Sequence, residues 1–316
     1  MTPAAAIDAL RGAFGTERVN ERVPLAPMTT FRVGGVADLL LEPRSSAEIV
    51  EALKLAARYE MSATMLGGGS NVLISDRGIR GLVIRPRGGE VRAAGDQSQR
   101  TVRADAALTI NGLVRWTVNH GLAALEAWAG TPGTVGGAIF GNAHFGGRNI
   151  GELVESVQIA ARDGAVRTAS ADAMAFAYDR SRLQQTGEIL LSADFRVAPG
   201  EPAVLRATAR QSLAFRKRTQ PLDTPSAGCN FQNPQPGLDR VPEGVPWSAG
   251  ALVDRAGLKG VAIGGARVST THGNFILNDG SATAADIRQL IDRCKLAVRE
   301  QFGVALREEI VYLGDW

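Results

Sequence analysis

The sequence predicts an α+β protein with more than one domain. The chain has 316 residues, whereas a single hydrophobic core rarely grows beyond ~250–300 residues. Strand-like and helix-like runs alternate irregularly, without the strand–helix repeat that marks a parallel α/β fold. The hydrophobic fraction of 45% and the charged fraction of 21% are those of a folded globular protein. We therefore expect two or three domains with long loops between their elements.

Hydrophobic spacing and capping residues locate the main helices and strands. Ile7, Leu10 and Phe14 follow the helical repeat and predict a short amphipathic helix. Ser45, with Glu48 three residues later, predicts a capping box that opens a helix. The predicted helices are 45–59, 110–120, 203–218 and 284–301, the predicted strands are 36–42, 61–66, 72–74, 81–85, 154–161, 188–197 and 306–313, and 87–99 is predicted as a hairpin or loop.

The charge pattern argues against a nucleic-acid partner. The formal net charge is only +3, and basic residues are scattered except at Arg216-Lys217-Arg218. A protein that binds a duplex needs clustered lysine and arginine side chains along the phosphate backbone. A small anionic ligand fits this balance better.

The cysteines and the N-terminal segment predict a cytoplasmic protein. Cys294 lies in a helical pattern and is expected in the core, while Cys229 lies in a loop rich in Gly, Asn and Pro. Nothing suggests a disulfide framework, which favours a reducing compartment. Residues 1–15 lack the apolar stretch of a signal peptide, and no run is long enough to span a bilayer. We expect no membrane association.

Two glycine-rich segments stand out as candidate ligand loops. Gly67-Gly68-Gly69-Ser70-Asn71 follows a predicted strand, and its backbone N–H groups and side chains have the make-up of a phosphate nest. Residues 130–138 form the second segment. Either one alone is as well explained as a tight turn, but two in one half of a chain favour a phosphate-bearing cofactor. No G-x-G-x-x-G motif follows a strand, so a Rossmann site is not indicated.

An ordered set of motifs along nearly the whole chain resembles the UDP-N-acetylenolpyruvoylglucosamine reductase family. The motifs 30–35, 66–73, 130–138 and 141–143 resemble the FAD-binding half of that family. In the second half, 220–221, 225–234, 248–250, 256–260, 272–275 and 306–314 follow in the family's order. No tyrosine-bearing insertion lies between Val197 and Ser226, so the chain resembles the shorter form of the enzyme.

The resemblance implies a fold and its domains. Two subdomains of the vanillyl-alcohol-oxidase (PCMH) type would hold FAD, and a C-terminal α+β domain would carry the substrate. The expected boundaries are 1–85 and 86–204 for the FAD-binding subdomains and 205–303 for the substrate domain, with 304–316 as a strand that returns to the FAD-binding half.

The resemblance also implies an activity. NADPH would reduce a non-covalent FAD, which would pass a hydride to C3 of the enolpyruvyl ether on a UDP-sugar, and a general acid would protonate C2. The product would be UDP-N-acetylmuramate, a precursor of peptidoglycan. We expect a monomer and no catalytic metal, because the three histidines are dispersed and form no Cys/His cluster.

The resemblance implies binding residues at matching positions. Cationic and amide donors suit the anionic groups of the substrate, which are a diphosphate and a carboxylate. The implied substrate-binding residues are Lys217, Asn233 and Lys259. The implied FAD-binding residues are Arg32, Gly67, Gly68, Gly69, Ser70, Asn71, Thr131, Pro132, Gly133, Gly136, Gly137 and Asn142.

Two of the implied catalytic residues are a thiol and a carboxylate. Cys229 stands where the family has a serine as proton donor, and a thiol is the stronger acid, with a reference pKa of ~8.5. Ser226 is an alternative donor. The family's Leu-x-x-Glu carboxylate corresponds to Glu309, which leaves Glu308 on the opposite face of the predicted strand.

The third implied catalytic residue is an arginine whose position departs from the family pattern. Asp179 occupies the usual arginine position, so the role would pass to Arg180, which can reach the site if it lies in a loop. Arg182 is the alternative on the same face if the segment is a strand. His144 stands where glycine is usual and is expected to pack locally, whereas His272 could contact ligand or make a structural hydrogen bond.

Overall fold

The structure, a computed structural model, describes residues 4–94 and 100–316. The chain forms two compact units. Unit 1 comprises Met1–Val23, Asp38–Gly68 and Arg80–Phe215, and unit 2 comprises Pro24–Ala37, Gly69–Ile79 and Arg216–Trp316. The domain boundaries expected near residues 85, 204 and 303 stay a prediction. None of the described helices is long and apolar enough to cross a bilayer.

The first part of unit 1 is a small sheet covered by two helices. Ala6, Leu10 and Phe14 of α1 (Ala4–Phe14) are buried in one hydrophobic core with the inner face of α2 (Ser46–Arg58). The sheet has the order β1-β2-β5-β3, and β3 pairs with β5 in parallel. Its strands are β1 (Val19–Pro24), β2 (Val36–Leu41), β5 (Ile79–Ile84) and β3 (Ala63–Met65).

Only half of the capping box predicted at α2 forms. The Ser45 hydroxyl accepts a hydrogen bond from the Glu48 N–H at 3.2 Å. The Glu48 carboxylate accepts instead from the Arg44 N–H and from the Arg18 guanidinium, the latter at 2.6 Å. A doubly bonded arginine is a stronger partner for a carboxylate than one backbone N–H. The hydrogen bond from Arg18 lowers the pKa of Glu48 to about 2.

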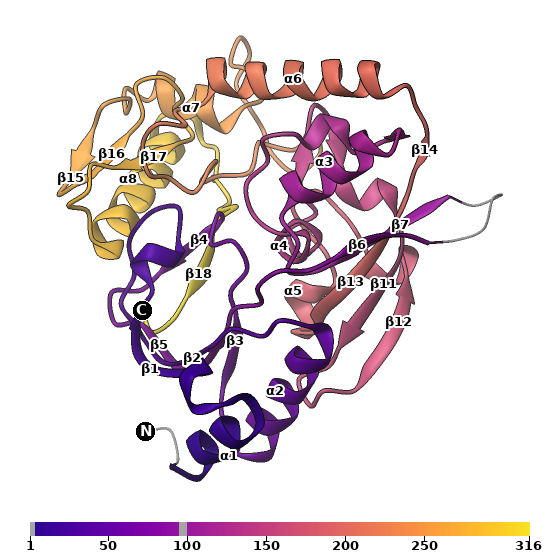
Figure 1. Cartoon of the computed structure of the whole chain (residues 1–316). Coiled ribbons are helices and arrows are strands. Elements are labelled where there is room, and N and C mark those ends of the chain that lie inside the picture. The colour runs from indigo at the N-terminus through magenta and orange to yellow at the C-terminus, as the bar shows by residue number, and fades with distance from the viewer. Residues whose placement is uncertain (1–3, 95–99) are drawn as a thin grey trace. The chain divides into compact units, whose positions relative to one another are not determined.

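The second part of unit 1 is a five-stranded antiparallel sheet with the order β12-β11-β13-β7-β6. Trp128 and Phe195 are fully buried in its core, and α4 packs against β13 (Figure 1). Of the hairpin or loop predicted over 87–99, residues 91–94 form β6, which pairs with β7 beyond the predicted range, and residues 95–99 lie outside the described part. The elements are β6 (Val91–Ala94), β7 (Thr101–Asp105), α3 (Ile110–Asn119), α4 (Val135–Phe140), β11 (Val154–Ala160), β12 (Val166–Ser170), α5 (Leu183–Thr186) and β13 (Ile189–Arg196).

Short pairs complete unit 1, and a long helix leads out of it. β8 (Leu122–Ala123) pairs with β14 (Ala198–Pro199), and β9 (His144–Phe145) pairs with β10 (Arg148–Asn149). The helix is α6 (Pro202–Thr219), in which Leu205 and Arg216 are the buried side chains.

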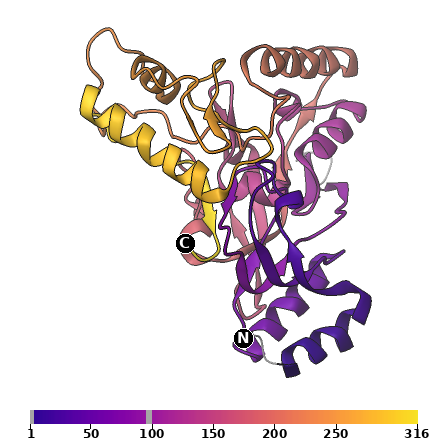
Figure 2. The same cartoon turned by 90° about the vertical axis from the view of Figure 1, so that its left-hand side faces the viewer.

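Unit 2 is built on two helices and a three-stranded antiparallel sheet, β15-β16-β17. Its core includes Phe231 and Cys294, so the core position predicted for Cys294 is confirmed. Burial raises the pKa of the Cys294 thiol to about 12. Figure 2 shows α8 along its full length. The elements are α7 (Ala249–Arg255), α8 (Ala284–Phe302), β15 (Ala262–Ile263), β16 (Ala266–Val268) and β17 (Ile276–Asn278).

The C-terminal strand is shorter than predicted. Within 306–313, only β18 (Val311–Leu313) is regular, and it pairs in parallel with β4 (Val72–Ile74). Residues 306–310 instead run beside another loop, with one isolated bridge between Glu308 and Phe231. Glu308 and Glu309 therefore lie before the regular strand, and the prediction that they occupy opposite faces of one strand does not hold.

The Arg18–Glu48 pair predicts a pH-dependent contribution to stability. Since the pKa of Glu48 falls from 4.5 to about 2 on folding, this stabilisation is present above pH 4.5 and is lost as the pH drops toward 2. Glu48→Gln should therefore lower the free energy of unfolding at pH 7 by roughly 1–3 kcal/mol, and by less at pH 3. Urea denaturation at the two pH values measures this difference. The control is Glu51→Gln on the exposed face of α2, and an equal loss in both variants would contradict the prediction.

Candidate active site

In unit 1, the two predicted glycine loops meet backbone to backbone. A Cβ added to Gly68 would lie 2.7 Å from the Gly133 Cα, and one added to Gly67 would lie 2.7 Å from the Thr134 Oγ1. Both distances are below normal contact, so this approach requires glycine. Thr134 then caps α4, where its hydroxyl accepts a hydrogen bond from the Gly137 N–H at 3.3 Å. The two loops therefore present backbone without side chains where they meet, and bare backbone N–H groups are what a phosphate-binding site uses. We call this arrangement the glycine cradle.

In unit 2, the rest of the first glycine loop is tied to the segment around residue 30. The Gly69 carbonyl accepts a hydrogen bond from the Thr30 N–H at 3.0 Å. Gly69 has a φ of +65°, and an added Cβ would collide with the Met28 carbonyl. Arg32 is exposed and donates to the Pro27 carbonyl at 2.9 Å. The predicted cofactor residues Gly69 and Arg32 thus belong to one interlocked turn.

Both polar atoms of the Asn142 carboxamide make hydrogen bonds to the backbone. It is 1% exposed, its Nδ2 donates to the Ala177 carbonyl at 2.7 Å, and its Oδ1 accepts from the Gly151 N–H at 2.9 Å. This side chain therefore positions the loop after α4 against the turn at 177–180.

Arg180 lies in a tight turn rather than in a strand. The backbones of Ala177 and Arg180 exchange two hydrogen bonds of 3.0 and 3.1 Å, and Asp179 adopts a φ of +52°. The Arg180 side chain is exposed. Arg182, the alternative, donates from Nε to the Glu188 carboxylate at 2.8 Å. Burial alone would raise the pKa of Glu188, but hydrogen bonds from Arg182 and Arg167 lower it to about 2, so Arg182 is held in a structural ion pair.

Two departures from the family pattern contact each other. The His144 Nδ1 lies 2.9 Å from the Asp179 Oδ1, and the Asp179 side chain is only 6% exposed. The His144 ring also lies beside Tyr178, with ring centroids 5.0 Å apart. Local packing was the sequence-based interpretation of His144, and the structure adds a specific acidic partner.

In unit 2, Cys229 and Glu309 lie on neighbouring segments. Residues 229–232 run between 274–275 on one side and 307–309 on the other. The Asn230 N–H donates to the Asn274 carbonyl, and the Asn230 carbonyl accepts from the Glu309 N–H, both at 2.9 Å. Cys229, next in the chain to Asn230, is partly exposed. The structure therefore brings together two of the three predicted catalytic residues.

Glu308 and Glu309 have different surroundings. The Glu308 carboxylate accepts from the Lys295 ammonium at 2.6 Å, and its side chain is 17% exposed. The Glu309 carbonyl accepts from the Asn71 side chain at 3.1 Å. Asn71 of the first glycine loop thus holds the backbone of Glu309, while Glu308 is committed to a structural ion pair.

All three predicted substrate-binding residues belong to unit 2. Lys259 is paired with Asp254 at 2.6 Å, and the Asn233 Oδ1 accepts from the Ala249 N–H at 3.0 Å. Lys217 is exposed near the end of α6.

Of the two roles expected for His272, the structure shows the structural hydrogen bond, since its Nδ1 accepts from the Asn274 N–H at 3.3 Å. Burial, together with the nearby Lys259, lowers the pKa of His272.

Sequence reasoning missed Arg216, which was grouped with Lys217 and Arg218 as a basic cluster. Arg216 is 6% exposed, and burial lowers the pKa of its guanidinium to about 10, whereas the charge of Cys229 acts to raise it. The available signal was helical spacing, since Arg216 lies eleven residues after the buried Leu205 and so falls on the same face of α6.

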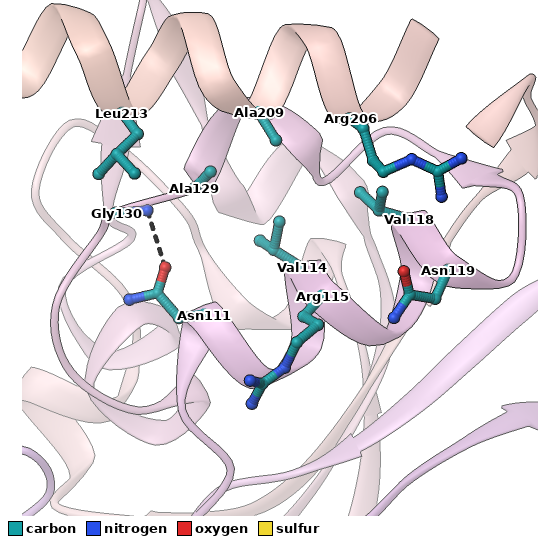
Figure 3. A pocket seen from close by; sticks show the side chains of 10 residues that line it. All are labelled: Asn111, Val114, Arg115, Val118, Asn119, Ala129, Gly130, Arg206, Ala209 and Leu213. Atoms are coloured by element: carbon teal, nitrogen blue, oxygen red, sulfur yellow. Dashed lines mark hydrogen bonds between the residues drawn. The ribbon is translucent and has the colours of Figure 1, made fainter. Parts of the chain in front are cut away.

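A hollow of about 520 Å³ separates α3 from α6 in unit 1 (Figure 3). Val114 and Val118 of α3 line it from one side, and Ala209 and Leu213 of α6 line it from the other. At its edge the Asn111 side chain accepts from the Gly130 N–H at 2.7 Å and donates to the Thr131 carbonyl at 3.2 Å. This asparagine braces the start of the second glycine loop.

These features define a flavin-binding protein. Residues 37–170 match the family described as "FAD binding domain", and this range contains both glycine loops. A glucose dehydrogenase, Phl p 4.0202, shares the fold at 15% identity and a TM-score of 0.50, over 63% of this chain and 44% of that one. Only glycine is tolerated where the two loops meet, which fits the bare backbone of a phosphate-binding loop.

Residues 220–313 match the family described as "UDP-N-acetylenolpyruvoylglucosamine reductase, C-terminal domain". A relative of that name from Synechococcus sp. (strain WH7803) is 40% identical over 94% of this chain and 93% of its own. Another from Gloeobacter violaceus is 38% identical over 94% of this chain and 97% of its own. The crystal structure of MurB from Thermus caldophilus superposes with a TM-score of 0.75 at 32% identity, over 94% of this chain and 99% of that one.

The chain therefore belongs to the UDP-N-acetylenolpyruvoylglucosamine reductase family. Both the resemblance seen in the sequence and the predicted fold class, an FAD-binding fold followed by a C-terminal α+β domain, are confirmed.

The contact between the glycine loops predicts a selective effect of a single methyl group. Gly68→Ala should reduce the bound flavin of the purified protein severalfold, because the added Cβ meets backbone atoms of Gly133 that have no room to move. The ratio of flavin to protein absorbance measures this. Gly12→Ala in α1 is the control, since nothing lies within 4 Å of its Cβ position. Full flavin content in Gly68→Ala would show that the two loops do not form the cradle.

Proposed function

We propose that this protein reduces UDP-N-acetylglucosamine enolpyruvate to UDP-N-acetylmuramate at the expense of NADPH, in the synthesis of peptidoglycan precursors. Family membership over nearly the whole chain supports the substrate. The observation that carries the assignment of the site is the placement of Cys229 and Glu309 on hydrogen-bonded neighbouring segments. The chemistry that bound FAD supplies is hydride transfer from NADPH to C3 of the enolpyruvyl double bond.

The residues that hold non-covalent FAD in this proposal come from the two glycine loops and the segments tied to them. Backbone N–H groups of the first glycine loop, at Gly67, Gly68 and Gly69, suit the pyrophosphate, because they donate without a competing side chain. Those of Gly136 and Gly137 already donate within the protein. Asn142 and Asn71 act by positioning these loops, in keeping with their internal hydrogen bonds. The proposed set is Arg32, Gly67, Gly68, Gly69, Ser70, Asn71, Thr131, Pro132, Gly133, Gly136, Gly137 and Asn142.

Three side chains carry the protein's part of the chemistry. Hydride addition at C3 leaves negative charge on the carboxyl side of the substrate, and Arg180 supplies a cation to stabilise it. The Cys229 thiol then donates its proton to C2, and the Glu309 carboxylate takes part in the proton transfer. Ser226, three residues before Cys229, is the alternative donor.

Lys217, Asn233 and Lys259 bind the anionic groups of the UDP-sugar in this proposal. Lys217 makes no hydrogen bond or ion pair with the described residues, so its ammonium can meet a phosphate at little cost. Lys259 must share its charge with Asp254. Lys217 is therefore expected to contribute more than Lys259.

We further propose a cytoplasmic monomer without nucleic-acid or membrane partners. The substrate domain spans 205–303 between the FAD-binding subdomains, 1–85 and 86–204, and the terminal strand segment, 304–316. Size-exclusion chromatography with light scattering tests the monomer.

Two anaerobic half-reactions test the function. NADPH should bleach the flavin absorbance of the purified protein, and the enolpyruvyl UDP-sugar should restore it. Acid precipitation should release the flavin into the supernatant, since the binding is non-covalent. Re-oxidation by a small alcohol-derived carbonyl compound and not by the UDP-sugar would identify an oxidoreductase of another substrate class on the same fold.

The different surroundings of the two neighbouring acids predict different effects on turnover. Glu309→Gln should lower kcat by about 10²–10⁴-fold, as expected for loss of a group in proton transfer. Glu308→Gln should leave kcat near the wild-type value and lower the melting temperature, because it breaks the pair with Lys295. Steady-state kinetics and thermal unfolding on the same samples separate the two. Equal losses of kcat would show that the assignment of Glu309 is wrong.

Loss of the Cys229 thiol should affect only the second half-reaction. In Cys229→Ala, flavin reduction by NADPH should run near the wild-type rate, while re-oxidation by the enolpyruvyl substrate should slow by about 10²–10⁴-fold. Cys229→Ser is the matched variant and should keep substantial activity, because a hydroxyl of similar size can still donate. Stopped-flow absorbance measures both steps. A wild-type rate of re-oxidation in Cys229→Ala would transfer the role of donor to Ser226 or a water molecule.

A further inference from the structure

The Asp179 carboxylate in unit 1 is buried and depends on His144. Its side chain is only 6% exposed, and its Oδ1 lies 2.9 Å from the His144 Nδ1. Its Oδ2 is buried and makes no hydrogen bond with any residue that the structure describes. Because an ionised carboxylate can only accept hydrogen bonds, the His144 Nδ1 carries the hydrogen of this contact. The imidazole thus offsets part of the cost of burying this charge.

The same contact helps to hold an unusual backbone conformation. Asp179 has a φ of +52°, in the left-handed region that residues other than glycine seldom adopt. Such a conformation persists only where the surrounding contacts hold it. The hydrogen bond between His144 and the Asp179 side chain is one of these contacts, and the hydrogen bond from the Gln184 Nε2 to the Asp179 carbonyl, at 3.0 Å, is another. Loss of His144 therefore removes part of what holds the turn at 177–180.

One short segment of unit 1 binds this turn at two points. The Asn142 Nδ2 donates to the Ala177 carbonyl at 2.7 Å, and His144, two residues later in β9, contacts the Asp179 side chain. Two backbone hydrogen bonds between Ala177 and Arg180 close the turn. Arg180 follows Asp179 directly and is exposed, and its guanidinium makes no hydrogen bond or ion pair with the described residues. The direction of the Arg180 side chain therefore depends on the backbone of the turn.

We propose that the His144–Asp179 pair positions Arg180, because it holds the acidic side chain inward and fixes the turn from which the neighbouring guanidinium reaches the substrate. His144 and Asp179 are positioning residues in this proposal, since they act through Arg180. The proposal rests on the function proposed above, in which Arg180 stabilises the negative charge left by hydride addition. It also gives a reason for the two departures from the family pattern to occur together, because a buried acid at position 179 requires a partner.

The first experiment measures the exchange of backbone amide hydrogens in the FAD-loaded protein without substrate, by mass spectrometry. The N–H groups of Ala177 and Arg180 close the turn, so they exchange when it opens. In His144→Ala, a peptide covering 175–182 should exchange about tenfold faster than in the wild type, the effect of losing one hydrogen bond. His144→Asn should restore the wild-type rate, because the asparagine Nδ2 can donate from the place of the histidine Nδ1.

His120→Ala is the matched control, since it removes an exposed histidine at the end of α3 and should leave the exchange of this peptide unchanged. Wild-type exchange of the 175–182 peptide in His144→Ala would overturn the proposal.

The second experiment follows the two half-reactions by stopped-flow absorbance. His144→Ala should slow re-oxidation by the enolpyruvyl UDP-sugar about tenfold, as expected for a displaced group, and should leave flavin reduction by NADPH unchanged. His144→Asn should recover most of the lost rate. In the double variant His144→Ala/Arg180→Ala, re-oxidation should be no slower than in Arg180→Ala alone, because the pair acts through Arg180. Additive losses in the double variant, or equal slowing of both half-reactions in His144→Ala, would contradict the proposal and indicate a general structural effect.

Asp179→Gly provides the same test if His144→Ala does not fold. It removes the buried charge together with the pair, and glycine tolerates the positive φ at this position. This variant should also speed the exchange of the 175–182 peptide and slow re-oxidation. Wild-type behaviour in both measurements would reject the positioning role.

Failure of this proposal can be told apart from failure of the proposed function. Slow re-oxidation in Arg180→Ala together with a wild-type rate in His144→Ala would keep the function and reject the positioning role. If the UDP-sugar does not re-oxidise the wild-type flavin, the function itself is rejected, and hydrogen exchange, which needs no substrate, then decides alone whether the pair holds the turn.

Discussion

The side chain and backbone of one buried residue, Asn274, hold the segment that carries Cys229. The Asn274 Oδ1 accepts from the N–H groups of Asn230 and Phe231, at 3.1 and 2.9 Å, and its Nδ2 donates to the Phe231 carbonyl at 2.7 Å. Asn274 is 3% exposed, so each of these bonds is shielded from water and costly to lose. On the other edge of the segment, the Asn230 carbonyl accepts a hydrogen bond from the Glu309 N–H. Because this segment is hydrogen-bonded on both edges, the backbones of Cys229 and Glu309 are held in one relative position.

The first glycine loop extends this constraint toward the cofactor half of the sequence. Asn71 bonds to the Glu309 carbonyl with its side chain, and its own carbonyl accepts from Val311 at the start of β18. Asn71, a residue of a predicted FAD loop, thus fixes the backbone of Glu309, the acidic residue proposed for catalysis. The glycines before it serve a different purpose, which is to keep Cβ atoms out of places where backbone meets backbone. Hydrogen bonding and steric exclusion therefore act on adjacent residues of the same loop.

One position that the sequence analysis singled out as a departure from the family pattern has a chargeable partner. Asp179 stands where that pattern predicts an arginine, and its carboxylate lies 2.9 Å from the His144 ring. Because the Asp179 side chain is only 6% exposed, such a neighbour offsets part of the cost of burying its charge.

Local sequence was sufficient for most of the secondary structure and for the identity of the motifs. Thr283 caps α8, Gly303 ends it with a φ of +70°, and Cys294 lies on its inner face, because spacing and capping act within a few residues. The motif order was likewise enough to identify the FAD-binding fold and the family.

Only the tertiary structure decided which charged side chains are already engaged in ion pairs within the protein. Arg182 was the alternative to Arg180, Glu308 the neighbour of the preferred Glu309, and Lys259 an expected substrate ligand, yet each is committed to an ion pair. Arg216 read as part of a basic cluster, yet it is buried. Asn71 meets Glu309 across 238 positions of sequence, and no local pattern encodes such a contact, since it depends on how distant segments pack.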